Sequence, residues 1–368
     1  MEIKYFRAEE KDIWNNFIGN SIYGDILHYW QWGETKKIEG WAPQRIAVMS
    51  EGKIVLAAQI LSKKASFLGN YIYIAHGPVF NDKNLLKNAL PLLKNELIAY
   101  AKLNDAFVIE IEPKVCYVSE EDLTTPIISK NLQPFVDPAI IKIFESKGFI
   151  QTNRNTQPKF KLFYDLEKSK EDLLGLMKKN TRYNVRLAER KSVQITEYKL
   201  TDPRIDGIID QFYSMLLETQ ERAKGYPIRP QAFFKELVKQ FIDTDAISFF
   251  EAKYQDQVVS MNISQRTKSW ASSFYASSNR KFTEVKAPYL MRWKAVLAAK
   301  LFGSKVYDFW GIIPNSQQHQ GYSENKLSFG GVRLNTYGLL ALPINVTKYL
   351  IWDKTLKYRS KLMGIFKK

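Results

Sequence analysis

One succession of elements, a hairpin followed by a long amphipathic helix and a further strand, limits the folds that this chain can adopt. Residues 45–49 and 54–61 are strand-like and flank Glu51-Gly52, a dipeptide that favours a tight hairpin turn. Residues 81–102 carry apolar side chains at helical spacing, and residues 107–111 again favour a strand. Because strands that alternate with helices are typical of α/β folds, this order predicts an α/β unit with a mixed sheet.

The length of the chain and a second run of elements predict two such units. At 368 residues the chain is long for a single hydrophobic core, and its 45% hydrophobic content is ample for two. Three strand-like runs lie between residues 247 and 276, and Pro288 is predicted to open the helix that follows, over 289–302. The loop-rich segment 116–147 places the boundary between the two units near Gly148.

The sequence argues against a secreted, membrane-spanning or metal-binding protein. Its N-terminus has no apolar signal core, and its longest near-apolar run, residues 337–346, falls short of the ~20 residues that span a bilayer. Cys116 is the only cysteine, which excludes a disulfide within the chain. The three histidines, His28, His76 and His319, lack the spacing of metal ligands. We therefore expect a soluble, cytoplasmic protein with no metal ion and no cofactor.

A formal net charge of +16 indicates a polyanionic partner, such as nucleic acid, a phosphorylated substrate or an anionic membrane surface. One cluster of cations lies in residues 168–190, which we predict to form one helix. Four cations recur there at every fourth position and form a basic ridge: Lys178, Arg182, Arg186 and Arg190. Because like charges at this spacing destabilise a helix, the ridge favours a bound anion over a merely solvated face.

The stretch from Tyr307 to Leu334 combines an aromatic strand, a polar segment and two adjacent glycines. We predict that residues 314–325 form a polar, mobile loop leading to Lys326, with Phe329-Gly330-Gly331 behind it. The glycines allow the backbone to approach either another strand or a substrate. On these residues alone, Lys326 is either a fixed cation that faces a reacting oxyanion or an ordinary surface lysine.

Two segments of this stretch resemble the C-terminal signature of the FemABX-type peptidoglycan bridge aminoacyltransferases: Tyr307-Asp308-Phe309-Trp310-Gly311-Ile312 and Lys326-Leu327-Ser328-Phe329-Gly330-Gly331. The family usually has Phe before this lysine, where this chain has Asn325. The resemblance implies an α/β fold of two N-acetyltransferase-like (GNAT-type) lobes, with mixed sheets facing a common cleft, which the order of elements also fits. It further implies that Lys326 is the catalytic residue.

Further matches to the family concern the acceptor substrate. Lys36 follows Trp32 by four residues, a spacing that the family uses to hold a phosphate of the sugar-nucleotide substrate. Considered alone, Lys36 would be a solvated helix residue. Arg229 and Phe233 match positions that help hold the nucleotide phosphates, with Phe where the family has Tyr, and Tyr275 lies in another family motif. The resemblance therefore implies that Lys36, Arg229, Phe233 and Tyr275 bind the substrate.

The implied function is transfer of an amino acid from aminoacyl-tRNA to the stem-peptide amine of a peptidoglycan precursor, either lipid II or UDP-MurNAc-pentapeptide. The basic ridge overlaps a family stretch, which here begins Lys179-Asn180-Thr181-Arg182, so its four cations are candidate tRNA contacts. Because the donor is already an activated ester, we expect direct attack by the amine without an acyl-enzyme. Glu110 and Glu112 are candidate proton acceptors or, alternatively, salt-bridged structural carboxylates.

The resemblance also divides the chain into three parts. Residues 1–148 form the first lobe, on the acceptor side, and residues 149–336 the second lobe, with the basic ridge and Lys326. Residues 337–368 return to the first lobe, where Tyr349 to Trp352 are expected to pack. The lysine-rich end from Lys357 onward is a candidate contact with an anionic membrane surface at the inner face of the cell membrane. Heptads of the length needed for the coiled-coil arm of some members are missing, so the chain resembles a FemX-like member without that arm.

Two other functions remain open. An acyl-CoA-dependent N-acyltransferase can share the fold, but residues 279–288 lack the glycine that usually lets a turn cradle a pyrophosphate, so we expect no acetyl-CoA binding. A non-catalytic protein that binds tRNA or a membrane could also have kept this scaffold. A functional Lys326 would distinguish an enzyme from such a protein.

Overall fold

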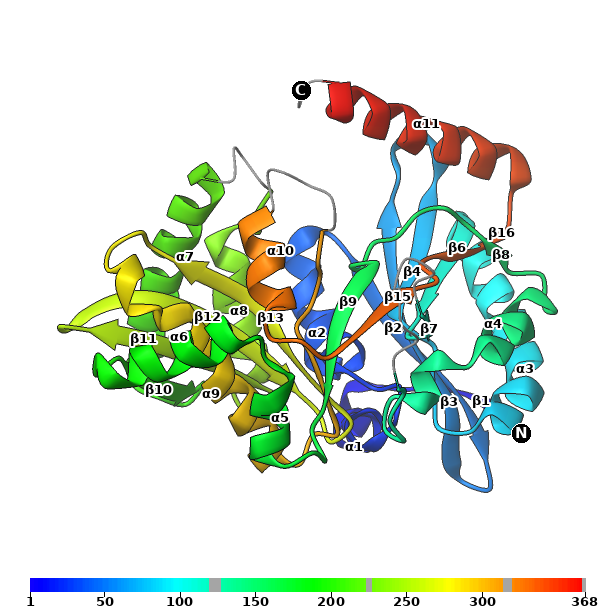
Figure 1. Ribbon diagram of the computed structural model, residues 1–368. Coiled ribbons are helices and arrows are strands. Elements are labelled where there is room, and N and C mark those ends of the chain that lie inside the picture. Colours follow the sequence, from blue (N-terminus) through cyan, green and yellow to red (C-terminus); the bar gives the residue numbers. More distant parts are fainter. Residues whose placement is uncertain (119–126, 223–226, 314–319, 366–368) are drawn as a thin grey trace.

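Two eight-stranded mixed sheets, each covered by helices, make up the fold (Figure 1). This computed structural model describes residues 1–118, 127–222, 227–313 and 320–365. Each sheet contains one parallel pair of strands among antiparallel neighbours: β4 (Asn70–His76) with β6 (Ala106–Pro113), and β13 (Trp270–Ser278) with β14 (Val306–Asp308). The predicted α/β class with mixed sheets is therefore confirmed.

The first sheet has the strand order β1-β2-β3-β4-β6-β16-β8, with β5 paired to β3. The predicted hairpin joins β2 to β3 through Glu51 and Gly52, both with positive φ. The predicted long helix is α3 (Lys83–Leu103), whose N-terminus is capped by Asp82. The other strands and helices of this lobe are β1 (Glu2–Tyr5), β2 (Ala42–Ser50), β3 (Lys53–Lys64), β5 (Val79–Phe80), β8 (Ile150–Gln151), β16 (Leu340–Pro343), α1 (Lys11–Asn20), α2 (Trp30–Lys36) and α4 (Pro138–Glu145).

The second sheet has the order β10-β11-β12-β13-β14-β9-β15-β7. Successive residues of β11 face opposite sides, since Phe249 packs with α7 and α8 whereas Phe250 packs with α6 and α9. Helices therefore cover both faces. The remaining elements are β7 (Cys116–Tyr117), β9 (Phe160–Asp165), β10 (Gln194–Lys199), β11 (Ile247–Tyr254), β12 (Gln257–Arg266), β15 (Val332–Thr336), α5 (Lys170–Leu176), α6 (Lys179–Arg190), α7 (Ile205–Arg222), α8 (Gln231–Phe241), α9 (Ala287–Phe302), α10 (Gln320–Leu327) and α11 (Val346–Ile365).

The two lobes exchange short strands. β16 follows the second sheet in the chain but lies between β6 and β8 of the first sheet. β7 precedes residue 148 but pairs with β15 of the second sheet. After β16, α11 crosses one end of the first lobe (Figure 1), and Tyr349 and Trp352 pack in a cluster with Phe107, as predicted. The exact limits of the lobes stay a prediction.

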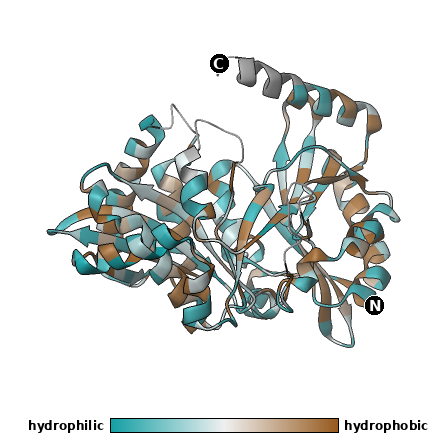
Figure 2. Cartoon of the chain, viewed as in Figure 1, coloured by the Kyte–Doolittle hydropathy of each residue, from teal (hydrophilic) through white to brown (hydrophobic). Residues whose placement is uncertain are grey.

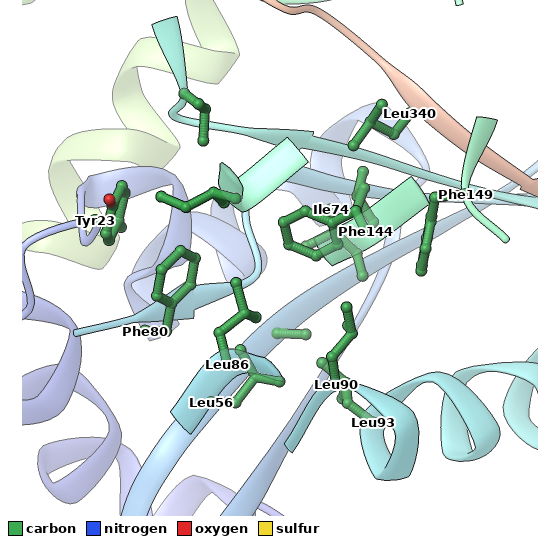
Figure 3. Packing of buried hydrophobic residues seen from close by; sticks show 14 of the residues in the cluster. Tyr23, Leu56, Ile74, Phe80, Leu86, Leu90, Leu93, Phe144, Phe149 and Leu340 are labelled. Carbon is green, nitrogen blue, oxygen red and sulfur yellow. The ribbon is translucent and has the colours of Figure 1, made fainter. Parts of the chain in front are cut away.

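The core of the first lobe lies between α3 and the sheet. In Figure 3, Leu86, Leu90 and Leu93 of α3 point toward Leu56 of β3 and Ile74 of β4. Figure 2 shows hydrophilic and hydrophobic residues alternating along the helices that cover the sheets, as expected for helices with one buried face. A separate apolar cluster joins the lobes, because it combines first-lobe residues such as Trp32 with second-lobe residues such as Phe233.

Several local predictions are wrong. The segment 168–190 is two helices, because Met177 and Lys178 are extended and end α5 before α6 begins. Residues 26–36, whose sequence favours a single helix, begin instead with a short 3-10 turn, η2 (Ile26–His28), and α2 starts at Trp30. Pro288 is the second residue of α9, not its first.

The polar segment before Lys326 is also not wholly a loop. Residues 320–327 form α10, and Lys326 lies in its last turn. The first part of the predicted loop, including His319, lies outside the described residues.

Candidate functional site

A cluster of cations lies where the two lobes meet. Lys36 ends α2, and the 3-10 turn that follows, η3 (Lys37–Glu39), brings the Glu39 carboxylate back onto the Lys36 ammonium. The same carboxylate forms an ion pair with Arg229 of the second lobe. The Arg229 Nε donates to the Tyr275 hydroxyl at 2.8 Å, and its guanidinium lies 4.4 Å from the centroid of the Phe233 ring. The fold thus gathers all four predicted substrate-binding residues around one carboxylate.

Positive charge exceeds negative charge in this cluster. Lys63 of β3 donates its Nζ to the Glu39 carbonyl oxygen at 2.7 Å, which makes a third cation beside Lys36 and Arg229. The Trp41 ring lies 5.4 Å from the Lys36 Nζ and 5.6 Å from the Lys63 Nζ. Burial, and then the neighbouring Arg229 and Lys63, lower the pKa of Lys36. The three cations and one carboxylate therefore suit a further anion.

Lys36 is buried, with 7% of its surface exposed, so its interpretation as a solvated helix residue is wrong. Its role in holding a substrate phosphate stays a prediction, as do the roles of Arg229, Phe233 and Tyr275. The sequence analysis missed Glu39 and Lys63. Only the position of Glu39 directly before Gly40, whose positive φ ends the turn, hinted that its side chain would fold back.

A second polar centre lies deeper in the second lobe. Lys161 of β9 and Asp308 of β14 form a buried ion pair at 3.0 Å, and the Trp310 backbone N–H donates to Asp308 at 2.7 Å. The Lys161 ammonium lies 5.0 Å from the centroid of the Trp310 ring. The sequence analysis missed Lys161, although a lysine within an otherwise apolar strand was a usable signal.

Lys326 belongs to this second centre and is buried, so the alternative of an ordinary surface lysine is wrong. Its Nζ donates to the Gly311 carbonyl oxygen at 2.9 Å. Burial, and then the positive charge of Arg292, lower the pKa of Lys326 well below its usual range, while Asp308 opposes that shift. Its charge therefore depends on the anions that come near it. The catalytic role assigned to Lys326 stays a prediction.

The segment behind Lys326 is held by close backbone packing. A Cβ on Gly330 would lie 2.0 Å from the Leu176 carbonyl oxygen, and one on Gly331 would lie 2.5 Å from the Phe163 carbonyl oxygen. Both glycines have positive φ. Of the two explanations for this Gly-Gly pair, approach to neighbouring backbone is the correct one. Asn325, where the family has Phe, accepts a hydrogen bond from Arg292.

The two candidate proton acceptors on β6 have different surroundings. Glu110 forms an ion pair with Arg154 at 2.5 Å, as expected for a structural carboxylate. Glu112 accepts hydrogen bonds from the Tyr73 hydroxyl at 2.6 Å and from two backbone N–H groups, those of Thr156 and Gln157. Burial raises the pKa of Glu112 to about 7, against the opposing effect of these donors.

Glu112 and Lys161 share a small cavity between the lobes. Its volume is ≈ 10 Å³, which is room for about one water molecule. Burial raises the pKa of the Cys116 thiol, which also lines the cavity, so the thiol is protonated at neutral pH and is a poor nucleophile. The cavity is lined by His76, Glu112, Pro113, Lys114, Cys116, Gln157, Lys161, Trp270 and Thr336.

The basic ridge is only partly free for a partner. Lys178, at the junction of α5 and α6, is exposed, as are Arg186 and Arg190 on α6. Arg182 instead turns back and donates to the carbonyl oxygen of Met177, where the two helices join. The structure therefore leaves three of the four predicted tRNA contacts accessible, and assigns Arg182 a local structural role. Binding of tRNA by the ridge stays a prediction.

Within the described residues, no group of three or more His, Cys, Asp or Glu side chains is placed to hold a metal ion. A search of the same part of the chain found no helix long and apolar enough to cross a membrane.

Comparisons with known proteins agree with this architecture. The FemAB family sequence model matches residues 10–269 and 245–356. Lipid II:glycine glycyltransferase of Staphylococcus aureus (strain MRSA252) is 31% identical over 198 residues. That alignment covers 53% of this chain and 43% of the relative, so the match spans less than half of the relative's length.

Two solved structures share the fold. The crystal structure of FemX superimposes with a TM-score of 0.79 at 19% identity, covering 95% of this chain and 99% of FemX. A tandem GNAT protein from the clavulanic acid biosynthesis pathway gives 0.52 at 9% identity, covering 93% of this chain and 99% of its own. These likenesses confirm the predicted pair of GNAT-type lobes.

The raised pKa of Glu112 predicts how stability depends on pH. Because the folded chain holds this proton up to about pH 7 and an unfolded glutamate only to about 4.3, the stability from protonated Glu112 is complete below pH 4.3. This contribution to the free energy of unfolding decreases as the pH rises and is lost once the pH passes about 7. Glu112→Gln cannot ionise, so the wild type should lose about 3 kcal/mol relative to the variant between pH 4.5 and 7.5. Urea unfolding of both proteins across this range measures the difference, and a constant difference would contradict the assignment.

Proposed function

The chain belongs to the FemAB family, and from that premise we propose that it transfers an amino acid from aminoacyl-tRNA to the stem peptide of a peptidoglycan precursor. The observation that carries the proposal is the cation cluster between the lobes, where Lys36, Lys63 and Arg229 surround a single carboxylate. Lipid II and UDP-MurNAc-pentapeptide both contain a diphosphate, which can contact cations from both lobes at once.

An aromatic wall connects the cation cluster to the deeper polar centre. The Trp32 and Phe274 rings lie 5.7 Å apart, and the Phe274 and Trp310 rings lie 5.3 Å apart. Trp310 in turn contacts Lys161, the partner of Asp308. Trp32 and Phe274 are buried, so a precursor held by its diphosphate at the cations would reach Lys326 past these rings only after they move. The small volume of the inner cavity means that the lobes or the side chains lining it must move to admit the peptide amine.

The chemistry needs a proton acceptor and a group that stabilises the oxyanion. The acceptor amine attacks the ester carbonyl of aminoacyl-tRNA, so that a C–N bond forms and the bond to the ribose oxygen breaks. Glu112 has a pKa close to neutral and suits a group that takes the amine proton and returns it to the ribose oxygen. We assign the stabilisation of the negative charge on the carbonyl oxygen to Lys326 and Lys161, whose ammonium groups lie near the same Asp308 carboxylate.

Substitution of Lys326 tests this assignment. Lys326→Met keeps the length of the side chain and removes its donor, so turnover should fall about 10²–10³-fold while precursor binding is retained. The assay is transfer from aminoacyl-tRNA to UDP-MurNAc-pentapeptide or lipid II, followed by mass spectrometry of the product. Lys294→Met, on the exposed side of α9, is the control and should keep wild-type turnover. If Lys326→Met stays within about threefold of the wild type, Lys326 is not catalytic.

We assign the tRNA to the exposed part of the basic ridge. Each phosphate contact that is lost should reduce the slope of log affinity against log salt by about 0.7–0.9, so Arg186→Gln/Arg190→Gln should reduce it by about 1.4–1.8. Filter binding of tRNA at several salt concentrations measures the slope. Lys87→Gln/Lys142→Gln removes the same charge from exposed positions of the first lobe and should leave the slope unchanged. Equal slopes for both pairs would show that α6 does not contact tRNA.

The proposed site of action is the cytoplasmic face of an anionic membrane, where a lipid-linked precursor would lie. The outer face of α11 exposes Val346, Leu350 and Ile351 beside Lys354 and Lys357. Exposed apolar side chains can enter the lipid while neighbouring lysines contact anionic headgroups. The adjoining turn η4 (Ser66–Leu68) packs on α11 through Leu68 and carries Phe67, which is 83% exposed.

Vesicle binding tests the membrane assignment. Leu350→Ser/Ile351→Ser should weaken co-sedimentation with phosphatidylglycerol vesicles at least about tenfold, because each side chain contributes ~1.5–3 kcal/mol when it is buried in lipid. The control is Leu301→Ser, which changes an equally apolar residue that is 91% exposed on α9 and should bind as the wild type does. Undiminished binding by the double variant would show that α11 does not contact the membrane.

A further inference from the structure

The carboxylate of Glu39 occupies the place where a ligand anion would meet the cation cluster. It pairs with Lys36 from its own lobe and with Arg229 from the other lobe, while Lys63 holds its backbone carbonyl oxygen. Sequence-distant cations thus converge on one side chain that carries a single negative charge. Any phosphate that binds Lys36 and Arg229 together must first displace this carboxylate.

We propose that Glu39 is an internal counter-ion that fills the anion site when it is empty, so that only ligands with more charge and more oxygen atoms than a single carboxylate displace it readily. The inference rests on the proposed function and adds to it a residue that determines which anions the site accepts. Glu39 therefore acts as a tethered competitor of the substrate diphosphate.

The covalent link between Glu39 and the site explains why the charge of a ligand decides whether that ligand displaces Glu39. Because Glu39 is joined to the site by the chain itself, its carboxylate is present at a high effective concentration. A ligand with one negative charge only replaces one carboxylate contact by another and gains little. A diphosphate brings more charge and more oxygen atoms, enough to meet Lys36, Lys63 and Arg229 together. The apparent affinity of every anion equals its affinity for the open site multiplied by the fraction of molecules in which Glu39 has left the site.

The local structure gives Glu39 a way out. It ends a 3-10 turn of three residues, and Gly40, with positive φ, follows directly. A Cβ on Gly40 would have only the flexible end of Lys63 within 4 Å, at 3.9 Å. The side chains of Glu39 and Arg229 are 19% and 31% exposed, so both reach solvent. Glu39 can therefore turn toward water without unwinding α2.

A purely structural role and a competing role for Glu39 predict opposite effects of removing its charge. If its carboxylate only holds Lys36 and Arg229 in position, removing its charge should loosen the cations and weaken anion binding. If it competes with the ligand, removing its charge should strengthen binding. Calorimetric titration of the full chain with pyrophosphate and with inorganic phosphate distinguishes the two.

We expect the wild type to bind pyrophosphate at least about tenfold more tightly than phosphate. Glu39→Gln should bind pyrophosphate and phosphate each about tenfold more tightly than the wild type does, because either anion must displace the same carboxylate. Glu39→Asp keeps the charge on a shorter side chain and should tighten pyrophosphate binding by less than Glu39→Gln. The matched control is Glu34→Gln on α2, where Glu34 pairs with Arg45 at 2.9 Å and with Lys37, and it should bind both anions as the wild type does.

Each outcome separates this inference from the function on which it rests. Equal or weaker pyrophosphate binding by Glu39→Gln, in a protein with an unchanged melting temperature, would overturn the role of Glu39 and leave the phosphate site intact. If Glu39→Gln does not fold, equal or weaker binding by Glu39→Asp overturns it. Failure of both the wild type and the variants to bind pyrophosphate would overturn the phosphate site as well.

Discussion

The contact between α2 and α8 positions both halves of the candidate site. The Trp32 ring of the first lobe lies 6.0 Å from Phe233 and 5.7 Å from Phe274 of the second lobe, within an apolar cluster that both lobes share. Burial of aromatic rings is a large favourable contribution to packing, so this contact holds the two sheets in one arrangement. One turn of α2 after Trp32, Lys36 meets the carboxylate that also binds Arg229, and the cation cluster depends on that arrangement.

Ionisable side chains are concentrated between the lobes, where their burial is costly. Asp25 contacts His76 at 2.5 Å and Lys114 at 3.7 Å, and Lys161 pairs with Asp308, all at buried positions. Burying charges costs several kcal/mol per ion unless partners satisfy them, and a protein with apolar residues in their place is often as stable. The proposed transfer, which would require phosphate, amine and oxyanion to be stabilised in one cleft, gives a reason for keeping such groups there. The Lys114 ammonium, 3.9 Å from the centroid of the Trp270 ring, links the charged groups to the apolar core.

Local pattern predicted most of the fold but not the partners within the site. The hairpin at Glu51-Gly52 and the long helix α3 followed from turn chemistry and apolar spacing, since neither depends on distant contacts. The break between α5 and α6 was missed although Gly175 lies two residues before Met177, and α10 was missed because its polar sequence lacks an apolar stripe. The resemblance supplied Lys36 and Arg229, whereas Glu39 was marked only by the glycine that follows it, because its ion-pair partners lie in different lobes. The burial that lowers the pKa of Lys326 likewise arises only after folding.

The most direct test of the account is the composition of the cell wall with and without this protein. Muropeptides from cells that carry the gene and from cells that lack it are compared by mass spectrometry. The account predicts that cells without the gene lose at least one amino acid residue from the stem-peptide branch, and that restoring the gene brings the lost mass back. Identical muropeptides from the two cell types, under conditions in which the protein is produced, would contradict the proposed transfer.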